Sequence, residues 1–367
     1  MERRTLLTGF AAIGAVTLIG CGGEDEKPGP TRTPSTPTPT TTRTSAGVNP
    51  RIASTVATGL NVPWEIVFLA GGDALVSQRD EGSIVRISTT GEVTKVGDVD
   101  GASGRPGGEG GLLGLALAPD DESTLFAFVT TDSDNRVVRL TLDGDSLGEQ
   151  EPILTGIAIG SRHHGGRILF DGEGNLFVST GDAGDGALSQ DKGSLNGKIL
   201  RITQDGKAAP DNPFDNHTWS YGHRNIEGLA FDTDGRLWAT EFGERSADEL
   251  NLIERGKNYG WPEAEGRSDN SDFVNPKVTW GTDECSPAGL AITRSTAFLG
   301  ALQGECLFGV RLDGQEVGKP RAYFGGEHGR IRTVVTAPDG ALWVGTSNTD
   351  GRGDPRKNDD RIFRVTL

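Results

Sequence analysis

From residue 50 onward the chain repeats one pattern of β-strands six times. Each copy reads as an apolar strand, an Asp/Gly turn, a second apolar strand and usually a third strand near a polar hairpin. Successive copies begin 48, 54, 60, 62 and 44 residues apart, at Pro63, Gly111, Gly165, Asn225, Pro287 and Ile331. A small antiparallel sheet cannot shield both of its faces alone, so the stable arrangement packs the sheets radially. The repeat therefore predicts an all-β fold, a six-bladed β-propeller of four-stranded antiparallel blades over residues 50–367.

Two other arrangements also fit the repeat, a pair of β-sandwich sheets and a seven-bladed ring. In either ring we expect residues 51–58 to pair with the C-terminal segment RIFRVTL and close the circle. The 55 Gly and 18 Pro favour a turn-rich all-β protein, and no convincing helical pattern interrupts the repeat.

The first twenty residues, 1–20, read as an export signal that precedes the repeat. Arg3 and Arg4 stand before the short apolar stretch LLTGFAAIGAVTLIG, and this arginine pair resembles a twin-arginine signal. The sequence LIGC at residues 18–21 resembles the lipobox of bacterial lipoproteins, in which Cys21 would become the lipidated first residue. An ordinary secretion signal with an incidental Cys is the alternative.

Residues 21–49 are rich in Pro and Thr and lack apolar periodicity, so we expect a disordered tether. Signal, lipobox and tether together predict an exported lipoprotein, held by a lipid anchor at the extracytoplasmic face of the bacterial cell membrane. An exported compartment would permit a disulfide between Cys285 and Cys306. Two buried free thiols are the alternative.

The formal net charge of −16 argues against nucleic acid as a partner. A protein that binds the phosphate backbone normally needs a basic surface to replace its counterions. We therefore expect no nucleic-acid binding.

Four polar loops occupy the same place relative to their copies of the repeat: RPGGEGG, SRHHGG, WSYGHRN and GGEHGRIR. In a propeller, loops at matched positions converge on one face around the central axis. The residues that they would bring together are Glu109, His163, His164, Arg224, Asn225, Arg330 and Arg332.

Three arginines near a histidine suit an anionic, planar ligand, because guanidinium groups bind carboxylates through two parallel hydrogen bonds. The alternative is that each Arg pairs with one of the 52 acidic residues. For His163 the alternative is a loop histidine with satisfied hydrogen bonds, and His164 is expected to serve loop structure. Asp248 and Glu249, among Gly turns, form a weak candidate site for a hard cation such as Ca²⁺.

Several longer segments resemble a known family. They include GGLLGLALAP, HHGGRILFDGEGNLFVSTGD, NGKILRI, GRIRTVVTAPDGALWVGT and the block YGHRNIEGLAFDTDGRLWATEFGERSADELNLIERGKNYGWPE. Over residues 52–367 the chain resembles the soluble quinoprotein glucose/sorbosone dehydrogenases, in particular the aldose sugar dehydrogenase branch. The resemblance implies a six-bladed propeller with pyrroloquinoline quinone (PQQ) and Ca²⁺ that oxidises the anomeric hydroxyl of aldoses to lactones.

Residue roles follow from the resemblance where the motifs match. His163 matches the general base that takes the proton of the sugar C1 hydroxyl while hydride passes to PQQ. Arg224 and Asn225 match residues at the quinone oxygens, where positive charge would also aid catalysis. The further implied assignments are Arg330 and Arg332 at the PQQ carboxylates, the carbonyls of Gly243 and Glu244 at the cofactor's Ca²⁺, Glu249 and Tyr259 at a second Ca²⁺, and Trp280 at the sugar.

The chain departs from the glucose dehydrogenase branch at three cofactor-site positions. That branch has Gln in place of Glu109, Asp in place of Arg162, and a cofactor-binding Lys in place of Gln303. Loss of one charge-assisted contact would cost about 1.5–3 kcal/mol of cofactor affinity. Weaker PQQ binding or a different sugar preference is the expected consequence.

The implied partners are an aldose substrate and an external electron acceptor, either a quinone or a cytochrome. The long insertions of the glucose enzyme are absent, so we expect a monomer. Two functions from other classes stay open: a non-catalytic propeller that binds sugar or protein, and a metal-dependent propeller lactonase. The lactonase would need a cluster of carboxylates and Asn at the channel, where the loops offer mostly Arg and His.

Overall fold

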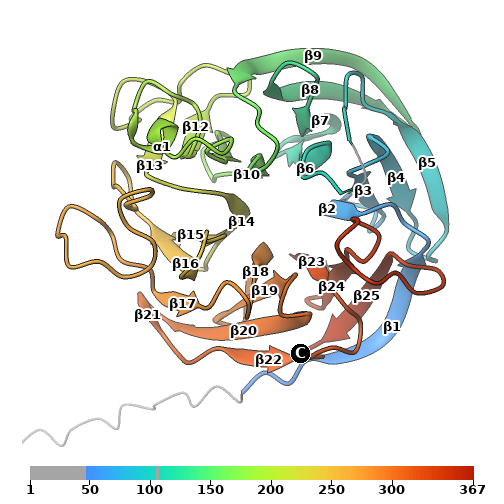
Figure 1. Ribbon diagram of the computed structural model, residues 1–367. Helices are drawn as coiled ribbons and strands as arrows, with labels where there is room; N and C mark the ends of the chain where they lie inside the picture. The colour runs from blue at the N-terminus through green and yellow to red at the C-terminus, as the bar shows by residue number, and fades with distance from the viewer. Residues whose placement is uncertain (1–46, 105–106) are drawn as a thin grey trace, which may run out of the picture. The chain divides into compact units, whose positions relative to one another are not determined.

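The computed structural model describes residues 47–104 and 107–367. These residues form six antiparallel sheets arranged as blades around a central axis, which confirms the six-bladed propeller (Figure 1). The export signal, Cys21 and residues 21–46 of the expected tether lie outside the described residues, so those predictions stay predictions.

The blades follow one another along the chain. Blade 1 contains β2 (Pro63–Phe68), β3 (Ala74–Gln78), β4 (Ser83–Ile87) and β5 (Val93–Asp98). Blade 2 contains β6 (Leu112–Ala118), β7 (Asp121–Thr130), β8 (Asn135–Asp143) and β9 (Ser146–Ile157). Blade 3 contains β10 (Gly165–Phe170), β11 (Leu176–Thr180), β12 (Lys198–Ile202) and β13 (Thr218–Tyr221).

The second half of the ring repeats this order. Blade 4 contains β14 (Ile226–Phe231), β15 (Leu237–Glu241), β16 (Asp248–Ile253) and β17 (Val278–Trp280). Blade 5 contains β18 (Pro287–Thr293), β19 (Thr296–Ala301), β20 (Cys306–Asp313), β21 (Glu316–Val317) and β22 (Arg321–Tyr323), the last two both pairing with β20. Blade 6 contains β23 (Ile331–Thr336), β24 (Leu342–Thr346), β25 (Arg361–Thr366) and β1 (Arg51–Thr58).

The two ends of the repeat meet in blade 6. Strand β1 pairs antiparallel with β25, from Arg51 opposite Thr366 to Thr58 opposite Arg361. Figure 1 shows the two strands side by side, β1 in blue and β25 in red. The predicted closure of the ring is therefore confirmed, and the sheet edge that β25 would otherwise expose is covered.

Each innermost strand has a register irregularity within its first residues. A bulge of this kind bends the strand and re-aims side chains, and it is common beside active sites. In four blades the residue at this position is charged although the strand around it is apolar. These residues are Glu65, Arg167, Glu227 and Arg332.

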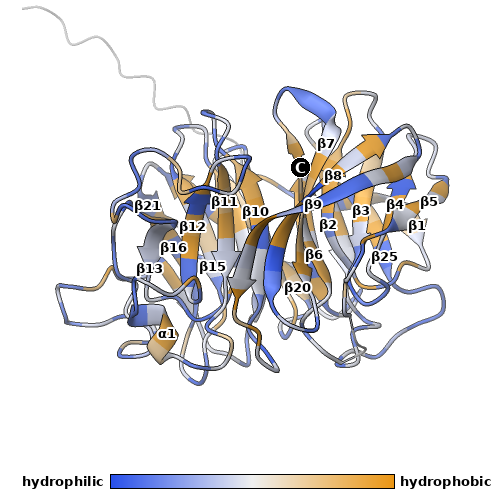
Figure 2. Cartoon of the chain, turned by 90° about the horizontal axis from the view of Figure 1, so that it is seen from above, coloured by the Kyte–Doolittle hydropathy of each residue, from blue (hydrophilic) through white to orange (hydrophobic). Residues whose placement is uncertain are grey.

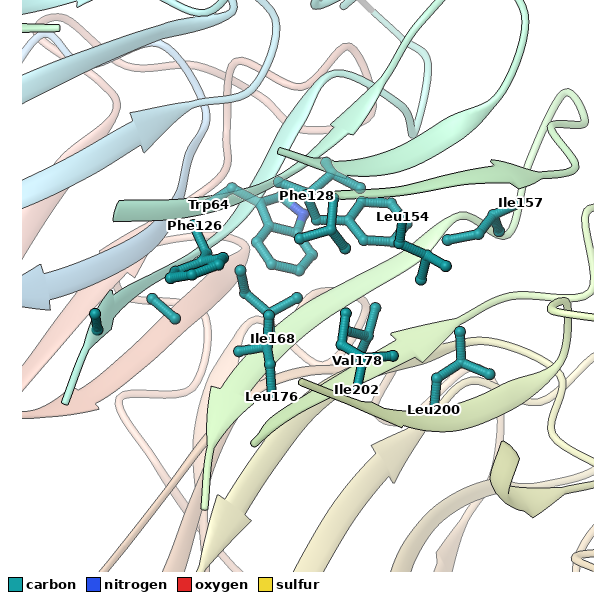
Figure 3. Packing of buried hydrophobic residues seen from close by; sticks show 14 residues of the cluster. Trp64, Phe126, Phe128, Leu154, Ile157, Ile168, Leu176, Val178, Leu200 and Ile202 are labelled. Carbon is teal, nitrogen blue, oxygen red and sulfur yellow. The ribbon is translucent and has the colours of Figure 1, made fainter. Parts of the chain in front are cut away.

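Hydrophobic contacts between neighbouring blades form the core. One cluster joins Trp64 of blade 1, Phe126 and Phe128 of blade 2, and Ile168 and Leu200 of blade 3 (Figure 3). Figure 2 shows the apolar colour concentrated on the strands and the polar colour on the connecting loops. Each blade thus buries its two faces against its neighbours, as the radial packing requires.

Helix is almost absent from the described residues, where α1 (Ala187–Gln190) has four residues. Within the same ranges no helix is long and apolar enough to cross a membrane. Cys285 and Cys306 are both buried free thiols, so the second of the two alternatives for this pair holds. Burial raises the pKa of the Cys306 thiol to about 11.

Ile362 tests the importance of the closing strand. It is fully buried and lies opposite both Ala57 of β1 and Gly345 of β24. We expect Ile362→Ala to lower the free energy of unfolding by about 2–5 kcal/mol, because it leaves a cavity at the closure. Val93→Ala, at a residue that is 39% exposed, should change it by less than about 0.5 kcal/mol. Denaturant unfolding measures both, and equal effects would contradict the role given to the closure.

Candidate active site

The loops at one end of the propeller enclose a central cavity of about 510 Å³. Its wall comes partly from the loops that precede innermost strands, as predicted, and partly from loops between second and third strands. The lining residues are Arg79, Glu109, Ser161, Arg162, His163, Arg224, Asn225, Glu227, Phe242, Gly243, Ser286, Leu302, Gln303, Arg330, Arg332 and Arg352. Glu109, His163, Arg224, Asn225, Gln303, Arg330 and Arg332 are thus brought together where the sequence predicted.

His163 is held on both its side chain and its backbone. Its Nδ1 lies 2.5 Å from Oδ1 of Asp182, and its backbone N–H donates to Oε2 of Glu109 at 2.6 Å. With Nδ1–H donated to the carboxylate, the neutral ring keeps Nε2 as its proton acceptor. His163 lines the cavity with only 4% of its surface exposed, so this acceptor is well placed to serve a bound substrate.

Asp182 was not identified from the sequence. It follows the buried strand β11, and its Oδ2 also accepts the indole N–H of Trp261 at 2.9 Å. Burial alone would raise the pKa of Asp182, but its hydrogen bond and charge interaction with His163 hold that pKa below its ordinary value. Asp182 therefore stays ionised and orients the imidazole.

The glycines after the two histidines have a packing role. Gly165 has φ +66°, and a Cβ there would lie 2.6 Å from Cα of Thr180. At Gly166 a Cβ would lie 2.6 Å from Cδ1 of Leu113. Only glycine allows this close approach, by which the His163 loop packs against β11 and β6.

The cavity wall is strongly cationic, with six arginines against two glutamates. Each of the three arginines predicted to bind an anion also has a carboxylate partner: Glu244 for Arg224, Asp350 for Arg330 and Glu227 for Arg332. The alternative expectation, that each Arg pairs with an acidic residue, is therefore true of these three arginines. The surplus of positive charge in a chain of net charge −16 nevertheless favours an anionic ligand.

Two further arginines of the wall were missed by the sequence analysis. Arg79 is 2% exposed, and its Nη2 is buried without a hydrogen-bond partner. Arg352 bonds to Oε1 of Glu109 at 3.0 Å. Both lie in loops that follow the second strand of a blade. These loops differ more in length and sequence than the loops between blades do.

A layer of buried charges forms the floor of the cavity. Arg332 donates to Oε2 of Glu227 at 2.5 Å, and Arg167 donates from Nε to the carbonyl of Glu227 at 2.9 Å. Arg167 also forms an ion pair with Glu65, and its guanidinium carbon lies 4.2 Å from the ring centroid of Trp64. We call Glu65, Arg167, Glu227 and Arg332 the charge layer. The sequence signal for it is a charged residue at the same place in four apolar strands.

A second cavity of about 440 Å³ lies beyond the charge layer, between the later halves of the innermost strands. Its wall is mostly apolar and includes Glu65 and Arg167. Buried charges require partners, and each charge of the layer has an ion pair within it, although Nη2 of Arg167 is buried without a hydrogen-bond partner. Glu227 lines the polar cavity and Arg167 the apolar one, so the hydrogen bond between them lies where the two cavities meet.

Gly243 and Glu244 differ in their placement. Gly243 lies in the cavity wall, and its N–H donates to Oδ1 of Asp248 at 2.9 Å. The carboxylate of Glu244 turns to Arg224 and to Arg162, the latter at 3.5 Å. A hydrogen bond from Arg224 is the main cause that lowers the pKa of Glu244. The side chain of Glu244 thus holds the arginine in place.

Glu249 and Tyr259 lie in a small pocket that also includes Glu241 and that shares Arg224, Phe242 and Gly243 with the wall of the central cavity. Burial and the charge of Glu241 raise the pKa of Glu249 to about 8. The Tyr259 hydroxyl donates to the carbonyl of Leu252 at 2.7 Å, so it is engaged by the main chain. Over residues 47–104 and 107–367, no group of three or more His, Cys, Asp and Glu side chains is arranged to hold a metal ion.

The prediction for Trp280 requires correction. Its side chain is 7% exposed and packs in the core between blades 4 and 5, with its ring centroid 5.5 Å from that of Phe308. It is not among the residues that line the central cavity. Trp280 ends the outermost strand of its blade, which places it far from the propeller axis.

His164 has the structural surroundings that were expected. Its Nδ1 lies 3.0 Å from Oδ1 of Asn135, in a buried site. Burial, the largest cause, lowers the pKa of His164 to about 4. The unfolded chain therefore binds a proton at this residue below about pH 6.5 while the folded chain does not.

The low pKa of His164 predicts acid sensitivity. As pH falls from 6.5 towards 4, this residue should remove on the order of 3 kcal/mol from the free energy of unfolding. His164→Gln abolishes this titration, so its stability should fall less steeply than that of the wild type over the same range. Urea unfolding at several pH values measures the two slopes. Equal slopes would show that His164 is not the acid-sensitive group.

The sequence matches a known protein family over most of its length. The family model of glucose / sorbosone dehydrogenases matches residues 60–354. Aldose sugar dehydrogenase YliI of Escherichia coli (strain K12) is 32% identical over 283 residues, which cover 66% of this chain and 76% of that protein. An uncharacterized protein of Synechocystis sp., slr1608, is 33% identical over 350 residues, 81% of this chain and 84% of that protein.

Solved structures agree with the sequence matches. The PQQ-bound form of aldose sugar dehydrogenase from Streptomyces coelicolor has 48% sequence identity and a TM-score of 0.84, covering 86% of this chain and 97% of that chain. A Thermus thermophilus protein, described as a putative oxidoreductase (glucose dehydrogenase), has 37% identity and a TM-score of 0.82, covering 87% and 100%. The chain thus belongs to the glucose/sorbosone dehydrogenase family.

Proposed function

We propose that this protein is a PQQ-dependent aldose sugar dehydrogenase that oxidises the anomeric hydroxyl of aldoses to lactones. One observation carries the proposal: a histidine oriented by an ionised carboxylate lines a cavity with six arginines. Such a cavity offers both a proton acceptor and a site for a polyanionic cofactor. Membership of the family, and the likeness to a PQQ-bound sugar dehydrogenase, support the same conclusion.

PQQ carries three carboxylates, and the charge of the cavity wall fits it. Arg330 and Arg332 would hold carboxylates, and Arg224 and Asn225 would hold the quinone edge. The unpartnered Nη2 of Arg79 is a further donor for an anion in this cavity. Gln303, also in the wall, would contribute a neutral contact. When bound, PQQ supplies a quinone that accepts two electrons from the sugar.

The protein's own contribution centres on His163. Its Nε2 would accept the proton of the C1 hydroxyl, which makes the sugar carbon a better hydride donor. Asp182 stabilises the imidazolium that forms, because the two groups are already 2.5 Å apart. Positive charge from Arg224 would favour electron transfer away from the sugar.

We further propose that Ca²⁺ takes part at two places. Hard cations prefer oxygen ligands, and the carbonyls of Gly243 and Glu244 would supply them beside the cofactor. Glu249 and Glu241 would supply carboxylates at a second site, where a cation would favour the ionised form of Glu249 against the burial that raises its pKa. The Tyr259 hydroxyl is already bonded to the main chain, so any contribution from Tyr259 would come from its backbone.

The location of the protein also remains a proposal. Export, lipidation at Cys21 and a tether would place this domain at the outer face of the cell membrane, as a monomer that passes electrons to an external acceptor. Labelling with a radioactive fatty acid tests the anchor. Cys21→Ser should abolish the label, and retention of the label would refute the lipid attachment.

PQQ binding is the first test of the function. We expect titration of the purified protein with PQQ and Ca²⁺ to change the PQQ absorption spectrum, because the cofactor would leave water for an arginine-rich cavity. Dye reduction with glucose and other aldoses should follow. Absence of both responses would refute the dehydrogenase and favour a non-catalytic propeller.

The two histidines provide a second test. His163→Ala should lower kcat by about 10²–10⁴-fold, since it removes the proton acceptor, while PQQ still binds. His164→Ala should have a much smaller effect on kcat, because that ring contacts Asn135 behind the cavity wall. Steady-state kinetics on cofactor-loaded protein, with circular dichroism to confirm folding, measures both. Equal losses would contradict the assignment of the base.

A chelator tests the second Ca²⁺ site. Glu249→Gln removes a carboxylate from the proposed cation site, so Ca²⁺ should stabilise the variant less than the wild type. We expect EDTA to lower the Tm of the wild type more than that of this variant. The same decrease in both would argue against a cation at Glu249.

A further inference from the structure

We propose that Arg352 is a positioning residue that acts through Glu109 on the backbone of His163. The proposal rests on the dehydrogenase function, because it concerns the same base. Arg352 was not identified from the sequence. It lies in the loop between β24 and β25, within the blade that closes the ring. Three loops from different blades are connected at this point.

The loop that carries Arg352 is attached twice to the loop before β6. Nη2 of Arg352 donates to Oε1 of Glu109 at 3.0 Å, and the N–H of Gly107 donates to the carbonyl of Asp350 at 3.1 Å. A charge-assisted bond and a backbone bond therefore fix Glu109 relative to blade 6. The closing blade thereby reaches a loop of blade 2.

Glu109 passes this constraint on to His163. Its second oxygen, Oε2, accepts the backbone N–H of His163 at 2.6 Å. His163 has φ +62°, a backbone conformation that is unfavourable in free energy for any residue other than glycine. Such a conformation persists only where the surrounding structure holds it. The Glu109 carboxylate is one such restraint. Burial works against its charge, but the hydrogen bond from His163 and the charge of Arg352 keep the pKa of Glu109 below its ordinary value.

The same loop also holds Arg330, one of the arginines proposed to bind the cofactor. The N–H of Arg352 donates to Oδ1 of Asp350 at 2.9 Å, and Oδ2 of Asp350 accepts from Nε of Arg330 at 3.1 Å. The short segment from Asp350 to Arg352 therefore holds both Glu109, which positions the base, and the side chain of Arg330. This arrangement would keep the distance between proton acceptor and cofactor constant.

The solvent exposure of Arg352 favours a positioning role over a role as a direct ligand of the cofactor. The Arg352 side chain is 51% exposed, whereas Glu109 is 17% exposed. Water and salt would weaken a direct contact between Arg352 and a bound anion. Its bond to the more buried Glu109 is the interaction that reaches the base, and small displacements of a base reduce turnover strongly.

Arg352→Gln, Arg352→Lys and Glu109→Gln test this assignment, alone and as the double variant Arg352→Gln/Glu109→Gln. We expect Arg352→Gln to lower kcat about tenfold, with PQQ affinity changed less than about threefold. Arg352→Lys should restore most of kcat, because it keeps the charge beside Glu109. The double variant should be no worse than Glu109→Gln alone, since the arginine acts through the glutamate. Arg139→Gln, which breaks an exposed ion pair with Glu151, is the matched control and should leave kcat unchanged.

Three results would overturn the proposal: an unchanged kcat, additive losses in the double variant, or a loss of PQQ affinity as large as the loss of kcat. The last would make Arg352 a cofactor ligand. The backbone amide signal of His163 in cofactor-free protein gives a readout that does not depend on PQQ. It should shift in Arg352→Gln and not in Arg139→Gln. If PQQ fails to bind wild-type protein, the dehydrogenase is refuted, and this amide signal alone decides whether Arg352 positions His163.

Discussion

Pairing of β1 with β25 is the interaction on which the rest of the structure depends. It joins residues more than 300 positions apart, and closing a chain of that length costs on the order of 5 kcal/mol in entropy. Backbone hydrogen bonds of the shared sheet and the buried side chain of Ile362 offset that cost. Because the ring is closed, blade 6 stands beside blade 1, and its loops reach those of blade 2. The central cavity exists only in this closed arrangement.

The regular part of the fold could be predicted from the sequence because it repeats. Six strand patterns of similar spacing specify six blades, and loops at matched positions specify one rim. Glu109, His163, Arg224 and Arg330 were found in this way, and all of them line the cavity. The resemblance to a family added roles for these residues, which the repeat alone does not provide.

The rest of the site depends on contacts that repeat spacing does not reveal. Asp182 and Arg352 lie after second strands, in loops of unequal length, and their importance comes from single hydrogen bonds to His163 and Glu109. Trp280 was assigned to the sugar by the resemblance alone, whereas its position at the outer edge of blade 4 places it in the core. Radial position within a blade therefore decides such cases, and a linear pattern does not report it.

The charge layer limits the side from which a substrate can reach the central cavity. Arg167 donates to the main-chain carbonyl of Glu227 where the central cavity, lined by Glu227, meets the apolar cavity, lined by Arg167. Entry of a sugar from that side would disrupt buried ion pairs, so among the described residues the loop rim is the more open route to His163. In the proposed reaction the sugar, its lactone and the electron acceptor would all pass through the opening at the loop rim. Under that proposal, the lactone would have to leave before the acceptor could use the same entrance.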